Sequence, residues 1–412
     1  MKAISAIALA AVLAAGATAV ATPAVAQKKQ AAAAPSWAPK LSKEERTALE
    51  PLEKAVQAKD WAAATAALPG AQAAARSADA RYFIGQFQLQ IGQGTNNTQV
   101  QAQGIDAMVA SGGGDPADRA LLFRNQGAIA QQAGDNAKAA RAFGEYLKLN
   151  PNDQEIAGAL ASMQARDNPA QAMALLEQQI ATARASGQKA PEDTYKRALQ
   201  YAYNGKQGPQ SVRLSRELVT AYPTPGNWRT ALLVYQQNGR LDDAAELDLL
   251  RLMRTTKSLS DKADYFRLAS ALNQRGLPGE TKAVVDEGLA ARAYSANDPS
   301  FKPLGALASQ RIAEDRAALP GLEQKAMASG TGTLALNTAD AYLGYGDYAK
   351  AASLYRAALQ KGSVDAGVAN TRLGMALAMA GQRAEAEAAF KAVTGARAEL
   401  AAFWLLWLSQ RG

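Results

Sequence analysis

The sequence predicts an all-α fold in which antiparallel helix pairs are stacked into a solenoid. Three observations lead to this prediction. The chain has 412 residues, more than one compact hydrophobic core normally contains. Hydrophobic residues make up 48% of the chain but aromatic residues only 6%, and the abundant alanine favours closely packed helices over strands. Finally, a pattern of small and aromatic residues recurs at a spacing of about 35 positions, which is typical of repeat proteins.

The first 26 residues have the features of a signal peptide. Lys2 provides a positive start, residues 3–20 form an apolar run, and Ala24-Val25-Ala26 is a small-residue cleavage site. We expect cleavage after Ala26, and the alternative is an uncleaved membrane anchor. The sequence therefore predicts the periplasm as the location of the protein, with secretion as the alternative. Because the chain has no cysteine, a lipid-modified cysteine and disulfides are excluded.

Residues 27–43 are predicted to form a basic, alanine- and proline-rich flexible leader. The net charge is +8, but 5 of the 45 basic residues precede Glu44, the first acidic residue, which leaves 40 basic against 37 acidic residues in the remainder. The body of the chain is thus nearly balanced in charge. This distribution argues against a nucleic-acid partner, and it favours a solvated linker over a segment that contacts an anionic surface.

The strongest repeat signal lies in residues 125–151, 337–362 and 372–395. Each segment contains a small residue, then a turn glycine, then an alanine five positions later and an aromatic residue four positions beyond that. In chain order these residues are Gly127, Gly134, Ala139 and Phe143; Ala339, Gly346, Ala351 and Tyr355; and Gly374, Gly381, Ala386 and Phe390. Two helices can cross closely only where small residues meet, so the pattern predicts helical hairpins.

Weaker copies of the pattern fall near the same spacing and predict about ten helix pairs over residues 44–396. One degenerate pair is expected within residues 301–327. The other candidate turns are Lys59–Trp61, Gly92, Arg166–Pro169, Gly205, Gly239 and Gly276.

This spacing resembles the tetratricopeptide repeat. In that family, helix A carries a small residue, helix B carries an alanine where the helices cross, and a proline follows helix B. Gly127, Ala139 and Pro151 match these positions in the best copy, and Trp228, Tyr235 and Ala244 match in another. The pattern departs from the family at Thr281, which replaces the alanine, and at Arg166, which replaces the turn glycine. The resemblance implies a right-handed superhelical solenoid of helix pairs.

The residue types exclude several classes of catalysis. Without histidine or cysteine, the chain has no Ser-His-Asp or Cys-His nucleophile and no imidazole or thiolate metal ligand. Residues 111–116 lack the lysine of a phosphate-binding loop. Chemistry with two carboxylates stays open as an alternative, but Asp242, Asp243 and Glu246 are better explained by the start of a helix. We therefore predict no enzymatic activity, no catalytic residues, no metal and no cofactor.

The resemblance places helix A along a concave groove that binds partners. Ala128 stands where the carboxylate clamp of the family has an asparagine, which argues against capture of a C-terminal carboxylate. Arginines in the groove could contact an acidic peptide or a sugar carboxylate, and for each residue the alternative is a solvated helix face. The residues that the resemblance places in the groove are Arg124, Gln131, Arg229, Gln236, Asn273 and Asp340.

Residues 397–412 are predicted to form an apolar C-terminal capping helix. Because Phe403, Trp404 and Trp407 belong to a run that is apolar all round, two hypotheses arise. The helix either packs against the preceding pair or offers a docking patch to a partner or to a second copy of the chain.

These observations favour a non-enzymatic scaffold or adaptor of the bacterial cell envelope that binds one or more proteins on a curved surface. One alternative is an accessory subunit of a machine that handles or exports envelope polysaccharide, for which a glycan is a possible ligand. Another is the helical domain of a peptidoglycan-active enzyme, although no residues remain for its catalytic domain. Contact with a membrane is expected only through an uncleaved signal segment.

Overall fold

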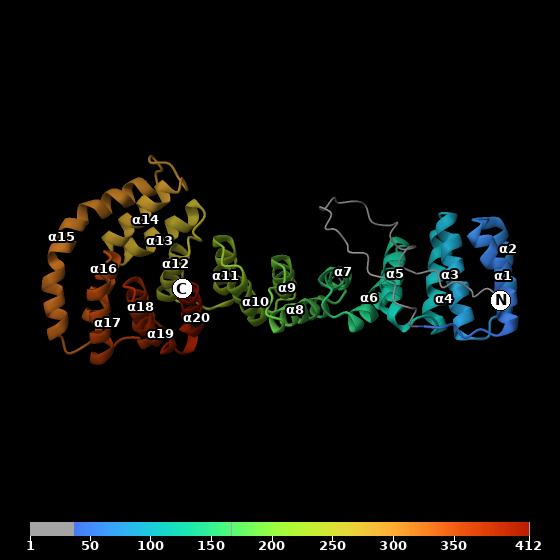
Figure 1. Ribbon diagram of the computed structural model, residues 1–412. Helices are drawn as coiled ribbons and strands as arrows, with labels where there is room; N and C mark the ends of the chain where they lie inside the picture. Colours follow the sequence, from blue (N-terminus) through green and yellow to red (C-terminus); the bar gives the residue numbers. More distant parts are fainter. Residues whose placement is uncertain (1–36, 166, 412) are drawn as a thin grey trace, which may run out of the picture. The chain divides into compact units, whose positions relative to one another are not determined.

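The computed structural model describes residues 37–165 and 167–411 (Figure 1). The predicted signal peptide, residues 27–36 of the predicted leader and Arg166 lie outside the described residues. Within the described residues the secondary structure is entirely helical. The chain divides between Ala190 and Pro191 into two compact units, which are taken in turn below.

The first unit consists of four consecutive helix pairs. Their helices are α1 (Lys43–Gln57), α2 (Trp61–Ala74), α3 (Ala78–Gly94), α4 (Thr98–Ser111), α5 (Arg119–Gln132), α6 (Asn136–Leu149), α7 (Gln154–Gln164) and α8 (Pro169–Ala185), with a short 3-10 turn at Pro116–Asp118.

The second unit consists of five helix pairs and two single helices. The pairs are α9 (Glu192–Asn204) with α10 (Gly208–Ala221), α11 (Pro225–Asn238) with α12 (Asp243–Thr255), α13 (Lys262–Gln274) with α14 (Pro278–Ala290), α16 (Thr333–Gly344) with α17 (Tyr348–Lys361), and α18 (Ala366–Met379) with α19 (Arg383–Lys391). The single helices are α15 (Phe301–Ala328) and α20 (Ala398–Ser409), and a 3-10 turn, Gly395–Arg397, precedes α20.

The all-α class and the organisation in helix pairs are thus confirmed, with one correction. The degenerate pair expected within residues 301–327 is instead the single helix α15, which is 28 residues long. A hairpin needs a turn near its middle, whereas the glycines of this segment, Gly305 and Gly321, lie toward its two ends. Pro320 stands inside the helix without ending it.

The small-residue and aromatic register is also confirmed. A Cβ atom added at Gly127 would lie 2.4 Å from the ring of Phe143, and one added at Gly374 would lie 2.5 Å from the ring of Phe390. The alanines of the second helices, Ala139, Ala351 and Ala386, are fully buried. In these copies the aromatic ring therefore occupies the space that the glycine leaves open in the facing helix.

The strongest turn glycines adopt the left-handed conformation that their position requires. Gly134 has φ of 80° and Gly346 has φ of 79°, which glycine adopts at little cost. Asp135 and Asp347, which follow them, accept hydrogen bonds from the first turn of the next helix, as N-cap residues do.

Three predicted turn glycines have other roles. Gly92 lies inside α3, where a Cβ would lie 2.5 Å from the backbone nitrogen of Gln101, and Asn96 is the left-handed residue of that turn. At the next site Lys206, and not Gly205, has the positive φ, while Gly239 is extended. Polar residues tolerate the left-handed region often enough that glycine alone does not locate every turn.

The described part of the predicted flexible leader packs against the first unit. The ring of Trp37 lies 5.7 Å from that of Tyr82 and 5.8 Å from that of Phe83. The backbone N–H of Lys40 donates to the carboxylate of Asp79 at 2.6 Å. Apolar contact and a satisfied backbone donor thus attach this end of the predicted leader to the first unit.

A single buried carboxylate joins the start of α1 to the loop before α3. Glu45 is 3% exposed, and its carboxylate accepts hydrogen bonds from the backbone N–H groups of Ser42, Arg76 and Ser77 at 2.8, 2.8 and 2.6 Å. Burial by itself raises the pKa of Glu45, but these donors outweigh it and lower the pKa to about 2.

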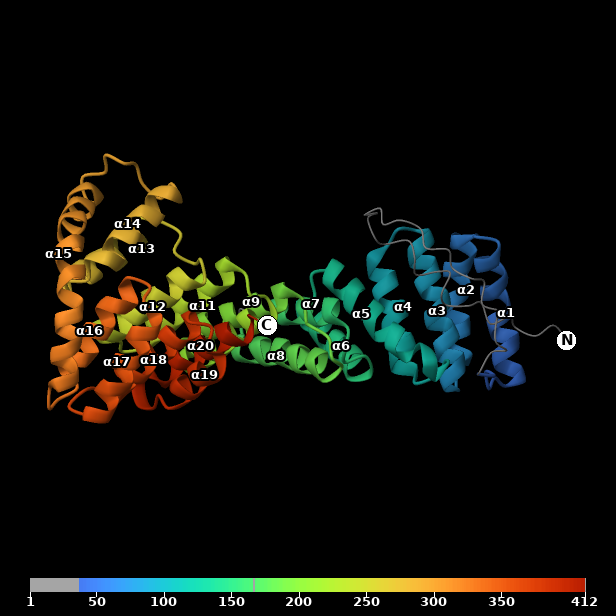
Figure 2. The same ribbon diagram turned by 60° about the vertical axis from the view of Figure 1, so that its left-hand side comes forward.

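The second unit closes on itself. Helix α12 packs against α18 and α20, which follow it by more than a hundred residues, and these helices lie side by side in both views (Figures 1 and 2). The side-chain amide of Gln410 donates to the backbone oxygen of Val219 at 3.0 Å. The C-terminal helix therefore completes the apolar core of this unit.

None of the helices in the described part of the chain combines the length and the apolar character needed to cross a membrane.

Candidate functional site

A cluster of buried ions lies where the second unit closes. At its centre is Asp248 of α12, which is fully buried. Its carboxylate accepts hydrogen bonds from Arg251 at 3.3 Å, from Nε of Arg372 at 3.0 Å and from Nη2 of Arg397 at 2.6 Å. One aspartate thus contacts guanidinium groups from α12, from α18 and from the turn before α20.

Two further carboxylates complete the cluster. Arg251 donates to Glu280 of α14 at 2.6 Å, and Arg372 donates to Asp340 of α16 at 2.6 Å. The hydroxyl of Tyr355 also donates to Asp340, at 2.6 Å. We call the three carboxylates and three guanidinium groups the buried ion cluster; its members are Asp248, Arg251, Glu280, Asp340, Arg372 and Arg397.

The charges of the buried ion cluster balance. Burial alone lowers the pKa of Arg251, but Glu280 outweighs it, and the pKa lies well above its ordinary value. Burial and the carboxylate of Asp340 both raise the pKa of Tyr355, so its phenol keeps the proton that it donates. Removing one partner of a buried ion pair leaves an uncompensated charge. If these helices packed in a different arrangement, buried charges would likewise be left without partners. The cluster therefore specifies which helices meet.

A pocket of about 390 Å³ adjoins this cluster. Leu343 of α16, Met375 and Met379 of α18 and Trp404 of α20 form its apolar wall. Trp404 is 1% exposed, and its indole N–H has no hydrogen-bond acceptor among the described residues. The wall exists only because the C-terminal helix returns to α12 and α18.

Charged side chains line the rest of the pocket. Arg254 donates to Glu287 through two nitrogens, at 2.8 and 2.5 Å. Lys257, just beyond the end of α12, and Arg411, just beyond the end of α20, are exposed and also line the pocket. Arg411 lies 4.9 Å from the ring of Trp407. Neither Lys257 nor Arg411 has a carboxylate partner in the described ranges, so both cations are available to a ligand.

The residues predicted for the groove divide between the two units. Arg124 and Gln131, both on α5, belong to the first unit. Arg124 lies 3.6 Å from Glu155, and Gln131 is exposed. The other four residues belong to the second unit, and none of them lines the pocket beside the buried ion cluster.

The four residues in the second unit differ in their surroundings. Arg229 pairs with Asp264 and, at 3.1 Å, with Asp261, so its charge is already neutralised. Gln236 and Asn273 are half-buried. Asp340 is not a groove residue, because Arg372 and Tyr355 hold it inside the buried ion cluster.

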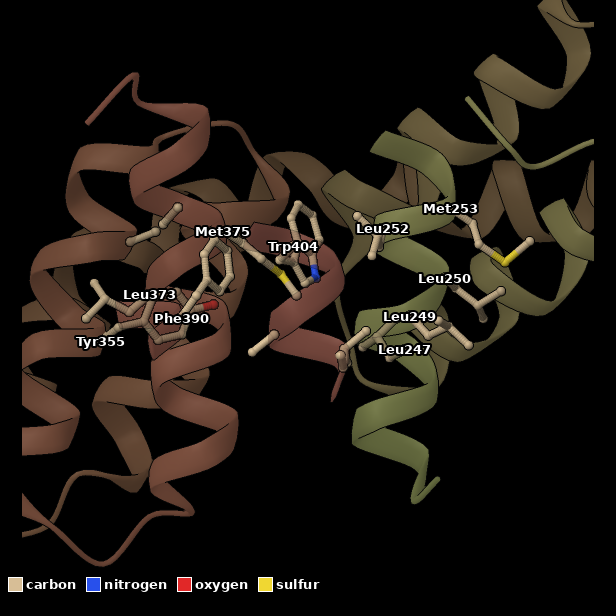
Figure 3. Packing of buried hydrophobic residues seen from close by; sticks show 14 of the residues in the cluster. Leu247, Leu249, Leu250, Leu252, Met253, Tyr355, Leu373, Met375, Phe390 and Trp404 are labelled. Carbon is tan, nitrogen blue, oxygen red and sulfur yellow. The ribbon is translucent and has the colours of Figure 1, made fainter. Parts of the chain in front are cut away.

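The structure corrects the expectation of a docking patch on the C-terminal helix. Phe403, Trp404 and Trp407 are 0%, 1% and 6% exposed. The ring of Phe403 lies 5.8 Å from that of Tyr235, and Trp404 stacks on Phe390 at 5.8 Å. Figure 3 shows Trp404 between α18 on one side and Leu252 of α12 on the other. The alternative hypothesis, that this helix buries itself, agrees with the structure.

Sequence patterns did not reveal the pocket residues Arg254, Lys257, Met379 and Arg411. They come from segments that are far apart in the chain and belong to no repeated position. The one local signal was the apolar run that contains Trp404, because a helix that is apolar all round needs a partner on each side.

Comparison with known proteins gives a likeness of fold. No protein-family model and no curated protein sequence matches the chain. Among solved structures, it is similar to a tetratricopeptide repeat protein from Parabacteroides merdae, with 13% identity over 65% of this chain and 100% of that one and a TM-score of 0.28. It is also similar to the C-terminal part of a TPR repeat-containing protein from Cytophaga hutchinsonii, with 12% identity over 80% of this chain and 99% of that one and a TM-score of 0.26.

Proposed function

We propose that this chain is an exported helical-repeat scaffold of the bacterial cell envelope, and that it holds a protein partner without catalysing a reaction. The observation that carries the proposal is the pocket in the second unit, where two cations that lack a carboxylate partner among the described residues stand beside an apolar wall. Ligand pockets use a small number of well-placed polar groups to orient what they bind. In the pocket beside the buried ion cluster, charged side chains stand next to an apolar wall, so it offers both kinds of contact.

The state of the carboxylates favours binding over acid–base catalysis. Glu280 and Glu287 line the pocket, and both accept hydrogen bonds from arginine side chains. These bonds occupy the lone pairs that a general base would use. The pocket therefore offers charge and apolar surface to a ligand, with its acidic groups already engaged.

The proposed location rests on the N-terminal sequence. Lys2, the apolar run of residues 3–20 and the site Ala24–Ala26 form the pattern of a cleaved export signal. A partner would then be another protein of the envelope.

Chemical crosslinking in the native envelope tests the proposal. The full chain should capture a protein partner, and the double substitution Lys257→Glu/Arg411→Glu should reduce that capture. The matched control is Lys302→Glu/Arg311→Glu, which reverses the charge of two exposed residues on α15 and should leave capture unchanged. Capture of polysaccharide in place of protein would overturn the proposal and favour a subunit that handles envelope glycan.

A further inference from the structure

The pocket beside the buried ion cluster has an excess of positive charge. Four of its lining residues are basic and two are acidic. Arg251 and Arg254 are paired with Glu280 and Glu287, so the excess resides on Lys257 and Arg411. A ligand that enters the pocket is favoured if it brings negative charge to these two side chains.

The backbone fixes the position of Lys257. It follows α12 with φ of 58°, and its N–H donates to the backbone oxygen of Arg254 at 3.1 Å. The next residue, Ser258, is buried and its N–H donates to Met253 at 2.8 Å. These hydrogen bonds fix the backbone at Lys257 and Ser258. The side chain of Lys257 therefore extends from a defined position at the edge of the pocket.

The apolar wall is adaptable. Met375 is buried and Met379 is half-buried, and both line the pocket together with Leu343 and Trp404. Methionine side chains are flexible and polarizable, so they pack against apolar groups of different shapes. The wall therefore suits an aliphatic or aromatic side chain without specifying one.

The volume limits the size of the ligand. At about 390 Å³, the pocket is near the lower end of the range of ligand sites, about 300–1,000 Å³. This space suits one or two side chains of a peptide. Because Glu280 and Glu287 already balance Arg251 and Arg254, only Lys257 and Arg411 are left to neutralise a ligand, which favours a single carboxylate over a phosphate cluster or a polyanion.

We propose that the pocket binds a segment of a partner protein in which an aspartate or glutamate lies next to a large apolar residue. The acidic side chain binds between Lys257 and Arg411, and the apolar side chain packs on Met375 and Met379. This inference rests on the proposed function, because it specifies the chemistry of the protein partner. The site forms where α20 packs against α12 and α18. Its two cations come from the residues just beyond the ends of α12 and α20.

Synthetic peptides provide the probe. A set of nonapeptides carries Asp-Leu, Asp-Phe or Glu-Met at its centre, and the matched controls carry Asn-Leu, Asp-Ser or Lys-Leu. Binding to the full chain is measured by fluorescence anisotropy at two salt concentrations. We expect the first set to bind at least 10-fold more tightly than the controls, and we expect high salt to weaken the binding. Equal binding of the Asn-Leu peptide would overturn the proposal.

Variants of the full chain locate the site. Lys257→Glu/Arg411→Glu should weaken binding of the Asp-Leu peptide at least 10-fold, whereas Lys302→Glu/Arg311→Glu should leave it unchanged. Circular dichroism melts of each variant separate loss of binding from loss of folding. An equal loss in both variants would contradict the proposal, since it would indicate a response to net charge alone.

Methionine NMR gives a readout that does not depend on substituting the pocket. The chain has eight methionines, and their ¹³C-methyl signals are assigned by Met→Leu variants. Added Asp-Leu peptide should shift the signals of Met375 and Met379 and leave that of Met327, which is 53% exposed on α15, in place. A shift of Met327 alone would show that the peptide adheres to exposed surface, and would overturn the proposal.

The two proposals fail differently. If Lys257→Glu/Arg411→Glu still captures the protein partner from the envelope, the pocket is not the docking site but the scaffold function stands. If no protein partner is captured by any form of the chain, the scaffold function itself fails.

Discussion

Nη2 of Arg397 lies 2.6 Å from Oδ2 of Asp248, although 149 positions separate the two residues in the chain. Both side chains are buried. This ion pair joins the turn before α20 to the middle of α12 and so marks the closure of the second unit. The pocket with Lys257 and Arg411 at its edge depends on that closure, because its walls come from both sides of it.

Substitution of Asp248 should destabilise the second unit. Asp248→Asn removes the charge that Arg251, Arg372 and Arg397 share, and an uncompensated buried charge costs about 3–5 kcal/mol. Calorimetry should show a lower melting temperature for one unit only. The control is Asp286→Asn, which removes an exposed carboxylate that pairs with Lys282 and should cost about 0.5 kcal/mol or less. Equal effects of the two substitutions would show that the cluster does not hold the closure together.

Acid should weaken the first unit through Glu45. Its pKa falls from 4.5 to about 2 on folding, so the unfolded chain takes up a proton at a higher pH than the folded one. The stabilisation is therefore present above pH 4.5 and is lost as the pH falls toward 2, and it amounts to roughly 3 kcal/mol. Chemical denaturation at a series of pH values measures it.

The variant Glu45→Gln should lose this stabilisation at neutral pH and show a flatter stability profile between pH 4.5 and 2. Glu155→Gln, at a carboxylate that is 81% exposed, serves as the control and should keep the steep profile of the unchanged chain. A steep profile in Glu45→Gln would assign the acid sensitivity to another group.

Two glycines of the same helix pair should respond oppositely to alanine. A Cβ at Gly127 would lie 2.4 Å from the Phe143 ring, whereas a Cβ at Gly144 would meet nothing within 4 Å. We expect Gly127→Ala to destabilise the first unit by about 1–3 kcal/mol through overpacking, and Gly144→Ala to stabilise it by about 0.5–1 kcal/mol through helix propensity. Urea denaturation distinguishes the two, and a stabilising Gly127→Ala would show that the register is wrong.

The contrast between the repeat and the closure explains what the sequence could predict. Gly127 and Phe143 belong to neighbouring helices, so their spacing in the chain is set by one hairpin and repeats wherever the hairpin does. The pairing of Asp248 with Arg397 depends on how many helix pairs intervene and how each is tilted, and no spacing encodes that. Asp340 illustrates the result, since the family pattern placed it in a groove and the closure buries it.

The prediction of turns from glycine was wrong where the glycine serves the packing of two helices. Gly92 matched the turn pattern by residue type, but it lies inside α3, where the backbone of the facing helix approaches closely. The long helix α15 was missed because the repeat spacing left room for one more helix pair in this part of the chain, whereas residues 301–328 form one continuous helix. The apolar C-terminal run was recognised as unusual, but its partners on α10, α11 and α12 are too distant in the chain for pattern reasoning to find.

Processing of the N-terminus is a further prediction. When the chain is expressed from its own start codon in a Gram-negative host, mass spectrometry of the periplasmic fraction should show a polypeptide that begins at Gln27. Ala24→Leu/Ala26→Leu should block cleavage and retain the chain at the membrane. A cytoplasmic chain that still begins at Met1 would contradict export.

The closure of the second unit is tested most directly by the distance between α10 and α20. The chain has no cysteine, so Thr220→Cys/Ser409→Cys introduces two label sites at exposed positions next to the hydrogen bond between Val219 and Gln410. Electron paramagnetic resonance of the spin-labelled full chain should give a single short, narrow distance distribution. A long or broad distribution would mean that the C-terminal helix does not return to α10, and the pocket that we assign to the partner would then not exist.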